Sequence, residues 1–332
     1  MAYNIHTNPK EVLYKMKDTK HKILTLAALT TIAAGVIHLT NRVIVASSQL
    51  KEMLDFSNHN YYNWRFGKIY YTKKGKGSPL LLIHDTMPGA SGYEWSRVED
   101  QLAQEHTVYT LDLLGCGRSE KAGITYTNFL FVQIICDFIK NVIKEKTDII
   151  ASGFSCSFVT TAAAYDKESI NKIMFINPVS MISLAQTTTK KDKLFKFFIE
   201  LPIFGTFIYH IIVSRETIND FFLDKLYYNP FHVDKDVLDA YYEAAHKGGY
   251  YAKCLYSSQS AKYMNINIRH AVESIDNSIY IVEGEDEPNG AAIVEAYQKV
   301  NPAIESATIP CSKHFPHIEN VDAFLEQVGA FF

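Results

Sequence analysis

Short apolar runs that alternate with helical stretches constrain the fold of this chain more than any other feature of its sequence. Residues 78–85 (SPLLLIHD) are apolar without alternation, which is typical of a strand buried on both faces of a sheet. Residues 94–104 then have helical spacing. Further apolar runs follow along the chain: HTVYTLDLLG (106–115), TDIIAS (147–152), KIMFIN (172–177) and SIYIVEG (278–284). Because strands that alternate with helices favour parallel pairing, we expect an α/β fold whose mostly parallel sheet carries helices on both faces.

The predicted sheet has a hairpin before these runs and a strand and a helix after them. Residues 61–74 predict a hairpin that turns at Phe66 and Gly67. Residues 306–310 predict a last short strand, and residues 315–332 predict an amphipathic terminal helix. Composition agrees with a globular chain, because 47% of the residues are hydrophobic and 21% are charged. A net charge of −3 does not attract a polyanion, so we expect no nucleic-acid partner.

The N-terminal part of the chain contains a segment that is long enough to cross a membrane. From Ile23 to Asn41, 19 residues carry no charged side chain, and a bilayer core needs about 20 apolar residues. We therefore expect a basic tail over residues 1–22 and a membrane-anchor helix over residues 23–48, with the lipid bilayer as its partner. The alternative is a buried or interfacial amphipathic helix. A cleaved signal peptide is disfavoured, because no small-x-small site ends the apolar stretch.

Charge and cysteine content favour different sides of that membrane. Five lysines precede the apolar segment, whereas only Arg42 and Lys51 follow it closely. The positive-inside rule then places the N-terminus in the cytoplasm and the rest of the chain outside. The five cysteines (116, 136, 156, 254 and 311) lack the paired spacing of a disulfide framework, which favours a reducing compartment instead. The side on which the body lies therefore stays open, with the outside slightly favoured.

Chemically reactive side chains follow four of the predicted strands. They are Asp112, Ser155, the acidic group Glu285–Glu287, and His314. Because the carboxyl ends of parallel strands meet at one edge of a sheet, we expect these side chains to lie together. A serine hydroxyl becomes an effective nucleophile when a histidine takes its proton and a carboxylate orients that histidine. The alternative for Ser155 is a helix N-cap, a position that serine prefers.

Five segments of the chain resemble motifs of the α/β-hydrolases. GFSCS (153–157) resembles their nucleophile elbow, a G-x-S-x-G turn between a strand and a helix. The others are PLLLIHD (79–85) before the oxyanion loop, LDLLGCGRSEK (111–121), VEGEDEP (282–288) around the acid, and KHFPHIE (313–319) around the histidine. The order serine, acid, histidine is that of the family. The resemblance implies a hydrolase core over residues 60–183 and 272–332, with a helical cap over residues 184–271.

The same resemblance assigns roles to individual residues. It implies Ser155, His314 and Glu287 as the catalytic triad, Asp286 as the fallback acid, and the N–H groups of Cys156 and Thr86 as the oxyanion hole. A helix that begins near the serine also directs its backbone N–H groups at an oxyanion formed there. The resemblance implies no organic cofactor and no metal.

Other residues near these motifs have structural interpretations. Cys311, His314 and His317 are spaced three apart, but a fourth ligand and a zinc-type spacing are absent, so we expect no metal site there. His317 is expected on the exposed first turn of the last helix. We expect structural roles in the loop after residue 111 for the following residues: Asp112, Gly115, Gly117 and Ser119.

Two residues depart from the family pattern. Asp85 stands where the family usually has glycine, and Ser157 replaces the last glycine of the elbow. A carboxylate beside the oxyanion loop would oppose a developing negative charge unless it points away. A non-catalytic ligand-binding protein on the same scaffold is therefore an alternative, and the order of the triad motifs disfavours a purely structural membrane protein.

The expected cap is rich in aromatic and apolar residues. Residues 193–213 form an apolar stretch broken by Pro202 and Gly205, and residues 231–249 predict an amphipathic helix. The stretch could line an apolar pocket, lie in a bilayer interface, or simply pack on the core. We therefore predict a serine hydrolase that cleaves an ester or thioester of a small apolar substrate. Hydrolysis of a carbon–carbon bond, an amide or a peptide stays open, because these reactions use the same triad. A serine at the elbow argues against dehalogenase or epoxide hydrolase chemistry.

Overall fold

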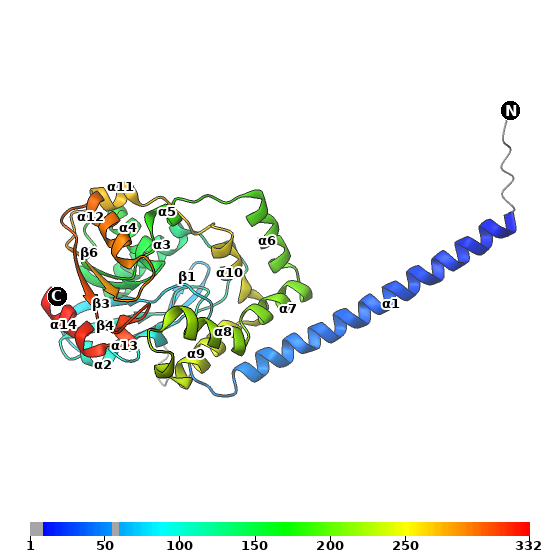
Figure 1. Cartoon of the computed structure of the whole chain (residues 1–332), viewed down its shortest axis with the longest axis horizontal. Coiled ribbons are helices and arrows are strands. Elements are labelled where there is room, and N and C mark those ends of the chain that lie inside the picture. The colour runs from blue at the N-terminus through cyan, green and yellow to red at the C-terminus, as the bar shows by residue number, and fades with distance from the viewer. Residues whose placement is uncertain (1–8, 55–59) are drawn as a thin grey trace, which may run out of the picture.

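The computed structural model describes residues 9–54 and 60–332, which form an α/β body and one long N-terminal helix (Figure 1). In the described residues, one sheet of eight strands has the order β1-β2-β4-β3-β5-β6-β7-β8. Its strands are β1 Asn60–Trp64, β2 Gly67–Lys74, β3 Ser78–Ile83, β4 His106–Leu111, β5 Thr147–Ser152, β6 Ile170–Ile176, β7 Ile279–Gly284 and β8 Glu305–Ile309. Strand β2 pairs antiparallel with β1 and β4, and the remaining pairs are parallel. The predicted hairpin and mostly parallel sheet are confirmed.

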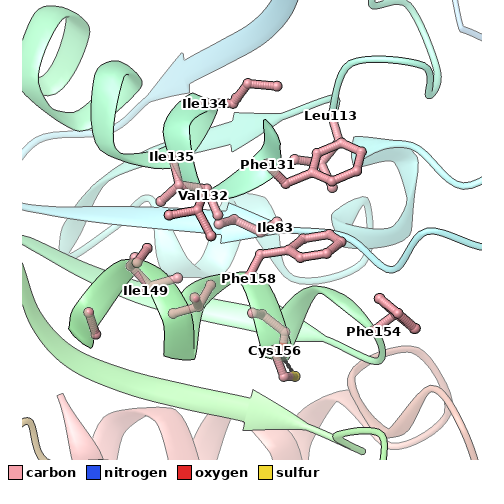
Figure 2. Packing of buried hydrophobic residues seen from close by; sticks show 14 of the residues in the cluster. Ile83, Leu113, Phe131, Val132, Ile134, Ile135, Ile149, Phe154, Cys156 and Phe158 are labelled. Carbon is pink, nitrogen blue, oxygen red and sulfur yellow. Dashed lines mark hydrogen bonds between the residues drawn. The ribbon is translucent and has the colours of Figure 1, made fainter. Parts of the chain in front are cut away.

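Helices cover both faces of this sheet, as continuous apolar strands require. On one face, Leu81 and Ile83 of β3 join a core with α3 Asn128–Phe138, α4 Ser155–Tyr165 and α12 Gly290–Val300. Figure 2 shows this packing, in which the rings of Phe131 and Phe158 stack 4.6 Å apart. On the other face, Leu80 and Leu82 pack with α2 Glu99–Leu102 and α14 Val321–Phe331. Because successive side chains of β3 point to opposite faces of the sheet, this strand contributes to the hydrophobic core on each face.

Two predicted helices are divided in the structure. Residues 94–104 form a 3-10 turn (Gly92–Trp95) and the short α2, and the Ser91 hydroxyl caps the first of these by accepting from the Tyr93 N–H. The terminal helix is divided into α13 Pro316–Glu319 and α14, because the Asn320 side chain accepts from the Ala323 N–H and caps a new helix.

Helices fill the chain between β6 and β7. They are α5 Met181–Leu184, α6 Lys190–Glu200, α7 Ile203–Ile212, α8 Arg215–Phe221, α9 Lys235–His246, α10 Lys253–Ser260 and α11 Arg269–Ser274. Helices α6 and α7 meet at an angle of 103° around Pro202, so this predicted break is confirmed. Gly205 lies inside α7, so its prediction as a second break is wrong. A Cβ at Gly205 would lie 2.2 Å from the Ile199 carbonyl oxygen, so this glycine serves the close approach of α6 and α7.

Helix α1 (Pro9–Ser48) extends away from the body, and the end of α1 packs on α7 and α9 (Figure 1). The Asn41 side chain donates to the Ile203 carbonyl oxygen at 3.0 Å, and Lys51 just beyond the helix pairs with the buried Asp239. Residues 17–48 are long and apolar enough to cross a membrane, and the most apolar window has no buried residue. The basic residues of the predicted tail belong to the same helix from Pro9 onward, and residues 1–8 lie outside the described part.

Candidate active site

Ser155 lies at a sharp turn between β5 and α4. Strand β5 ends at Ser152, and Gly153 takes the left-handed conformation, with φ of +55°. A Cβ at this glycine would lie 2.4 Å from the Asp85 carboxylate, so two constraints require glycine there. The Ser155 hydroxyl donates to the His84 carbonyl oxygen at 2.6 Å, and Phe154 is the residue that precedes the helix. The helix N-cap interpretation of Ser155 is therefore wrong.

His314 lies between two carboxylates that come from different loops. Its Nδ1 is 3.3 Å from Oε1 of Glu287, which follows β7. Its Nε2 is 3.4 Å from Oδ2 of Asp85, which follows β3. The neighbouring Asp286 is exposed, and its backbone N–H donates to the Ser312 carbonyl oxygen. The structure thus brings Glu287, and not the fallback acid, to the imidazole.

The Asp85 carboxylate binds one of the two predicted oxyanion-hole donors. Its Oδ1 accepts from the N–H of Thr86 at 2.6 Å and from the N–H of Phe154 at 2.8 Å. The N–H of Cys156, the other predicted donor, makes a 3.4 Å bond to the Gly153 carbonyl oxygen. Asp85 is 7% exposed and points into the site. One predicted oxyanion donor, the Thr86 N–H, is therefore already bound to a carboxylate. The sequence had left open whether Asp85 points toward this loop or away from it.

The two carboxylates change the charge state of His314. Burial by itself lowers the pKa of this imidazole, but the bonds to Asp85 and Glu287 outweigh it and raise the pKa to about 10. His314 is therefore an imidazolium at neutral pH, with both nitrogens engaged. Among the described residues, no hydrogen bond joins Ser155 to His314. In this arrangement the histidine is not free to accept the serine proton.

This ion pairing predicts a pH-dependent contribution to stability. Unfolded histidine loses its proton near pH 6.5, whereas folded His314 keeps it until about pH 10. The stabilisation is therefore complete below pH 6.5 and is lost as the pH rises toward 10. We expect the unfolding free energy of wild type relative to His314→Gln to fall steadily across that window in urea titrations. A difference that stays constant from pH 6 to pH 10 would show that His314 is not paired in solution.

A buried pair, Glu94 and His317, lies behind Asp85, and the sequence did not predict it. The Glu94 side chain is fully buried, and its Oε2 accepts from the Asp85 backbone N–H at 3.2 Å. His317 is also fully buried, stacks on Trp95 at 4.7 Å and lies 3.4 Å from Glu94 Oε1. The prediction of an exposed His317 is therefore wrong, because α13 turns inward and packs this ring against the 3-10 turn at Trp95. Only tertiary contact reveals that Glu94 and His317 are paired, since they are far apart in the sequence.

The loop after β4 is held by a buried ion pair. Asp112 accepts from Nε and Nη2 of Arg118 at 2.7 and 2.9 Å, and from the Gly92 N–H. Burial raises the pKa of this carboxyl, but Arg118 outweighs burial and holds the pKa at about 2. The Ser119 hydroxyl donates to the Asp112 carbonyl oxygen, and positive φ angles occur at Gly115 and Gly117. The predicted structural roles in this loop are confirmed.

No metal site is formed by the described residues, since nowhere do three or more histidine, cysteine or acidic side chains converge as ligands. The five cysteines of the described chain are all free, and Cys311 is the exposed one. His314 and His317, which the spacing had grouped with Cys311, contact the separate partners described above.

An apolar cavity of about 310 Å³ lies beside the oxyanion loop. It is lined by Met87 and Pro88 from the loop after β3, and by Ile212, Val213 and Phe222 from the helical insert. A second space of about 10 Å³ shares Met87 and Pro88 and also touches Thr86. Ser155 itself is fully buried. An apolar group could therefore be held next to the loop that carries Thr86.

Comparison with curated proteins gives partial matches. The chain is 28% identical over 114 residues to 2-hydroxy-6-oxo-6-(2'-aminophenyl)hexa-2,4-dienoic acid hydrolase of Metapseudomonas resinovorans, covering 34% of this chain and 39% of that protein. It is 38% identical over 67 residues to pimeloyl-[acyl-carrier protein] methyl ester esterase of Aliivibrio fischeri, covering 20% of this chain and 25% of the esterase. The matched stretches thus span well under half of these relatives.

Solved structures and a family match cover more of the chain. A serine hydrolase involved in carbazole degradation superposes with a TM-score of 0.67 at 18% identity, covering 82% of this chain and 98% of that one. A membrane phospholipase A superposes with a TM-score of 0.65 at 16% identity, covering 94% and 97% of the two chains. At these identities the likeness shows the fold. The family described as the alpha/beta hydrolase family matches residues 80–327, and the chain belongs to the α/β-hydrolase family.

Proposed function

We propose that this α/β-hydrolase is a serine hydrolase that cleaves an ester or thioester of an apolar acid. The observation that carries the proposal is the position of Ser155 at a glycine-dependent strand-to-helix turn, in the same site as the His314–Glu287 pair. The family membership supports hydrolysis, and the apolar cavity at Met87 and Pro88 supports an apolar acyl group.

In the proposed reaction, Ser155 Oγ attacks the carbonyl carbon of the substrate. Neutral His314 accepts the serine proton at Nε2, and Glu287 stabilises the resulting imidazolium through Nδ1. The backbone N–H groups of Thr86 and Cys156 hold the negative oxygen of the tetrahedral intermediate. His314 then gives its proton to the leaving alcohol or thiol, and water releases the acid from Ser155 by the same steps.

This reaction requires Asp85 to change its state first. His314 holds a proton at Nε2, and Asp85 holds an N–H group that the oxyanion needs. Transfer of that one proton from Nε2 to Asp85 leaves a neutral base and a neutral acid that binds N–H donors more weakly. The protonated Asp85 side chain then turns away, which frees both Nε2 and the Thr86 N–H. We infer that substrate binding in the apolar site favours this transfer, since desolvation disfavours the charged pair.

Hydrolysis of a carbon–carbon bond is the second candidate. It is supported by the similarity to the hexadienoic acid hydrolase, and the same triad would carry it. A panel of p-nitrophenyl esters beside a vinylogous diketone separates the two candidates by which substrate is turned over.

We also propose that α1 anchors the enzyme in a membrane, with the N-terminus in the cytoplasm and the body outside. Support comes from the exposed apolar helix over residues 17–48 and from the five lysines that precede its uncharged part at Ile23. Protease added to intact cells should then remove the body. Full protection in intact cells, with cleavage after lysis, would contradict this orientation.

The serine mechanism is tested by labelling with a fluorophosphonate probe, which reacts with activated serines. We expect slow labelling of wild type, faster labelling of Asp85→Ala and none of Ser155→Ala, because only the last lacks the nucleophile. Labelling at another residue, or no labelling of folded wild type and folded Asp85→Ala, would show that Ser155 is not activated. The latter result would favour a non-catalytic ligand-binding protein.

A further inference from the structure

A second and larger cavity lies where α1 meets the body. Its volume is about 670 Å³, and its lining contains no residue of the proposed triad. One wall is the end of α1, with Asn41, Arg42 and Val45. The other wall is α7, with Ile203, Thr206 and His210. The cavity is therefore formed only when α1 is packed on the helical insert.

Two buried polar side chains in this cavity have unused hydrogen-bonding groups. Asn41 is 7% exposed, and its Oδ1 has no partner in the described residues although its amide donates to Ile203. His210 is 3% exposed, and neither of its ring nitrogens has a partner there. Burial, followed by His246 and Lys253, lowers the pKa of His210 to about 4, so the ring is neutral and offers one donor and one acceptor. Unpaired buried polar groups cost stability, so a ligand that pairs them would be favoured.

Arg42 gives the same cavity a positive charge. It is exposed, and no described acidic side chain forms an ion pair with it. A guanidinium matches the geometry of a phosphate group better than any other side chain does. The lining around it is mostly apolar, through Val45, Pro202 and Ile203. The cavity therefore combines a cation and polar groups with an apolar wall, as an amphiphile requires.

The position of the cavity along α1 corresponds to the depth of lipid headgroups. The uncharged segment ends at Asn41, and Arg42 is the first charged residue after it. In a helix that spans a bilayer, this point lies at the boundary between acyl chains and headgroups. Apolar side chains of α6 and α7 are exposed near it: Leu194, Phe197, Phe198, Phe204, Ile208 and Ile211. Figure 1 shows α6 and α7 on the side of the body from which α1 extends.

We propose that this cavity binds one anionic phospholipid of the bilayer. Its phosphate pairs with Arg42, its headgroup hydroxyls bond Asn41 and His210, and the upper part of its acyl chains passes Ile203 toward the uncharged segment of α1 that ends at Asn41. This inference rests on the proposed membrane anchoring and not on the hydrolase chemistry. The C-terminal end of α7, at Ile212 and the following Val213, lines the cavity at Met87 and Pro88, so the lipid touches the helix that borders the proposed active site.

The test uses the full chain in phosphatidylcholine nanodiscs that contain a phosphatidylglycerol probe with a diazirine at the start of one acyl chain. After photolysis, peptide mass spectrometry locates the adducts. We expect them to concentrate on residues 38–46 and 203–210, and to be displaced by unlabelled phosphatidylglycerol but not by more phosphatidylcholine. Arg42→Gln should lower this labelling about fivefold, the contribution of one cation at an anionic surface, and Lys22→Gln should leave it unchanged.

A matched pair of variants separates a built site from simple bilayer contact. Ala46→Trp fills the cavity from an exposed alanine and should remove the concentrated adducts, whereas Ala33→Trp, exposed on the same helix, should not. Adducts spread evenly along α1, or adducts insensitive to Ala46→Trp, would overturn the lipid site while leaving the anchor in place. A chain that stays outside the nanodiscs would overturn the anchor as well, and fluorophosphonate labelling would be unaffected in each case.

Discussion

Replacing Asp85 with alanine should raise the hydrolysis of apolar esters by about 10²–10³-fold at neutral pH. One oxyanion-hole donor is typically worth this factor, and the Asp85 carboxylate holds the Thr86 N–H at 2.6 Å. The same change removes one of the two carboxylates that raise the pKa of His314 to about 10. A larger fraction of the histidine is then neutral and able to act as a base, so the limb of the pH–rate profile that rises as His314 loses its proton should move to lower pH.

The increase should be accompanied by a loss of stability. Without the carboxylate, the buried N–H groups of Phe154 and Thr86 have lost their acceptor, which costs about 1–3 kcal/mol. Initial rates with p-nitrophenyl butyrate and urea unfolding would measure the two effects together. Asp286→Asn is the matched control, because this nearby acid is exposed and does not contact His314. A fall in the rate of Asp85→Ala would contradict the proposal and would make Asp85 an obligatory acid or base.

Removing the serine hydroxyl from the activated enzyme should abolish turnover. We expect Ser155→Ala, made in the Asp85→Ala chain, to lower kcat by about 10⁴–10⁶-fold, the range found when a triad nucleophile is removed. The Asp85→Ala chain is the better parent for this comparison. We expect Asp85 to reduce the wild-type rate, and a slow parent would make the loss on removing Ser155 look smaller. The fold should persist, since the change removes only the bond to the His84 carbonyl oxygen, worth about 1 kcal/mol.

Ser152→Ala is the control that separates loss of the nucleophile from loss of a buried hydroxyl group. Ser152 is equally buried at the end of β5, and its hydroxyl has no partner in the described residues. This variant should keep the kcat of its parent. If Ser155→Ala also keeps it, the nucleophile is another group and the proposed mechanism fails. Circular dichroism of each variant confirms that the measured rates belong to folded protein.

The proposed lipid site and the proposed active site share one helix. Helix α7 contacts the anchor through Ile203 and lines the apolar cavity through Ile212 and Val213. A lipid bound at Arg42 therefore contacts the helix that borders the substrate cavity. Combining Asp85→Ala with Arg42→Gln in one chain would test whether the change in hydrolysis rate and the change in lipid labelling are independent.

Local patterns were sufficient for the sheet and for the location of the site. The apolar runs became β3 to β7 because unbroken hydrophobicity is stable only where a strand is buried on both faces. Their carboxyl ends brought Ser155, Glu287 and His314 to one edge, as parallel pairing requires. Helix boundaries were less predictable, since a single side-chain cap at Asn320 divided the terminal helix.

By itself, the sequence determined the α/β fold, the order in which reactive side chains follow the strands, and the presence of one long apolar helix near the N-terminus. Only the tertiary structure decided where Asp85 points, that His317 is buried against Trp95, and which acid meets His314. The physical reason is the range of the interactions. Strand and helix patterns depend on neighbours a few residues apart, whereas the Asp85–His314 contact joins residues 229 positions apart. Its geometry and its electrostatics exist only once the loops after β3 and β8 have been packed together.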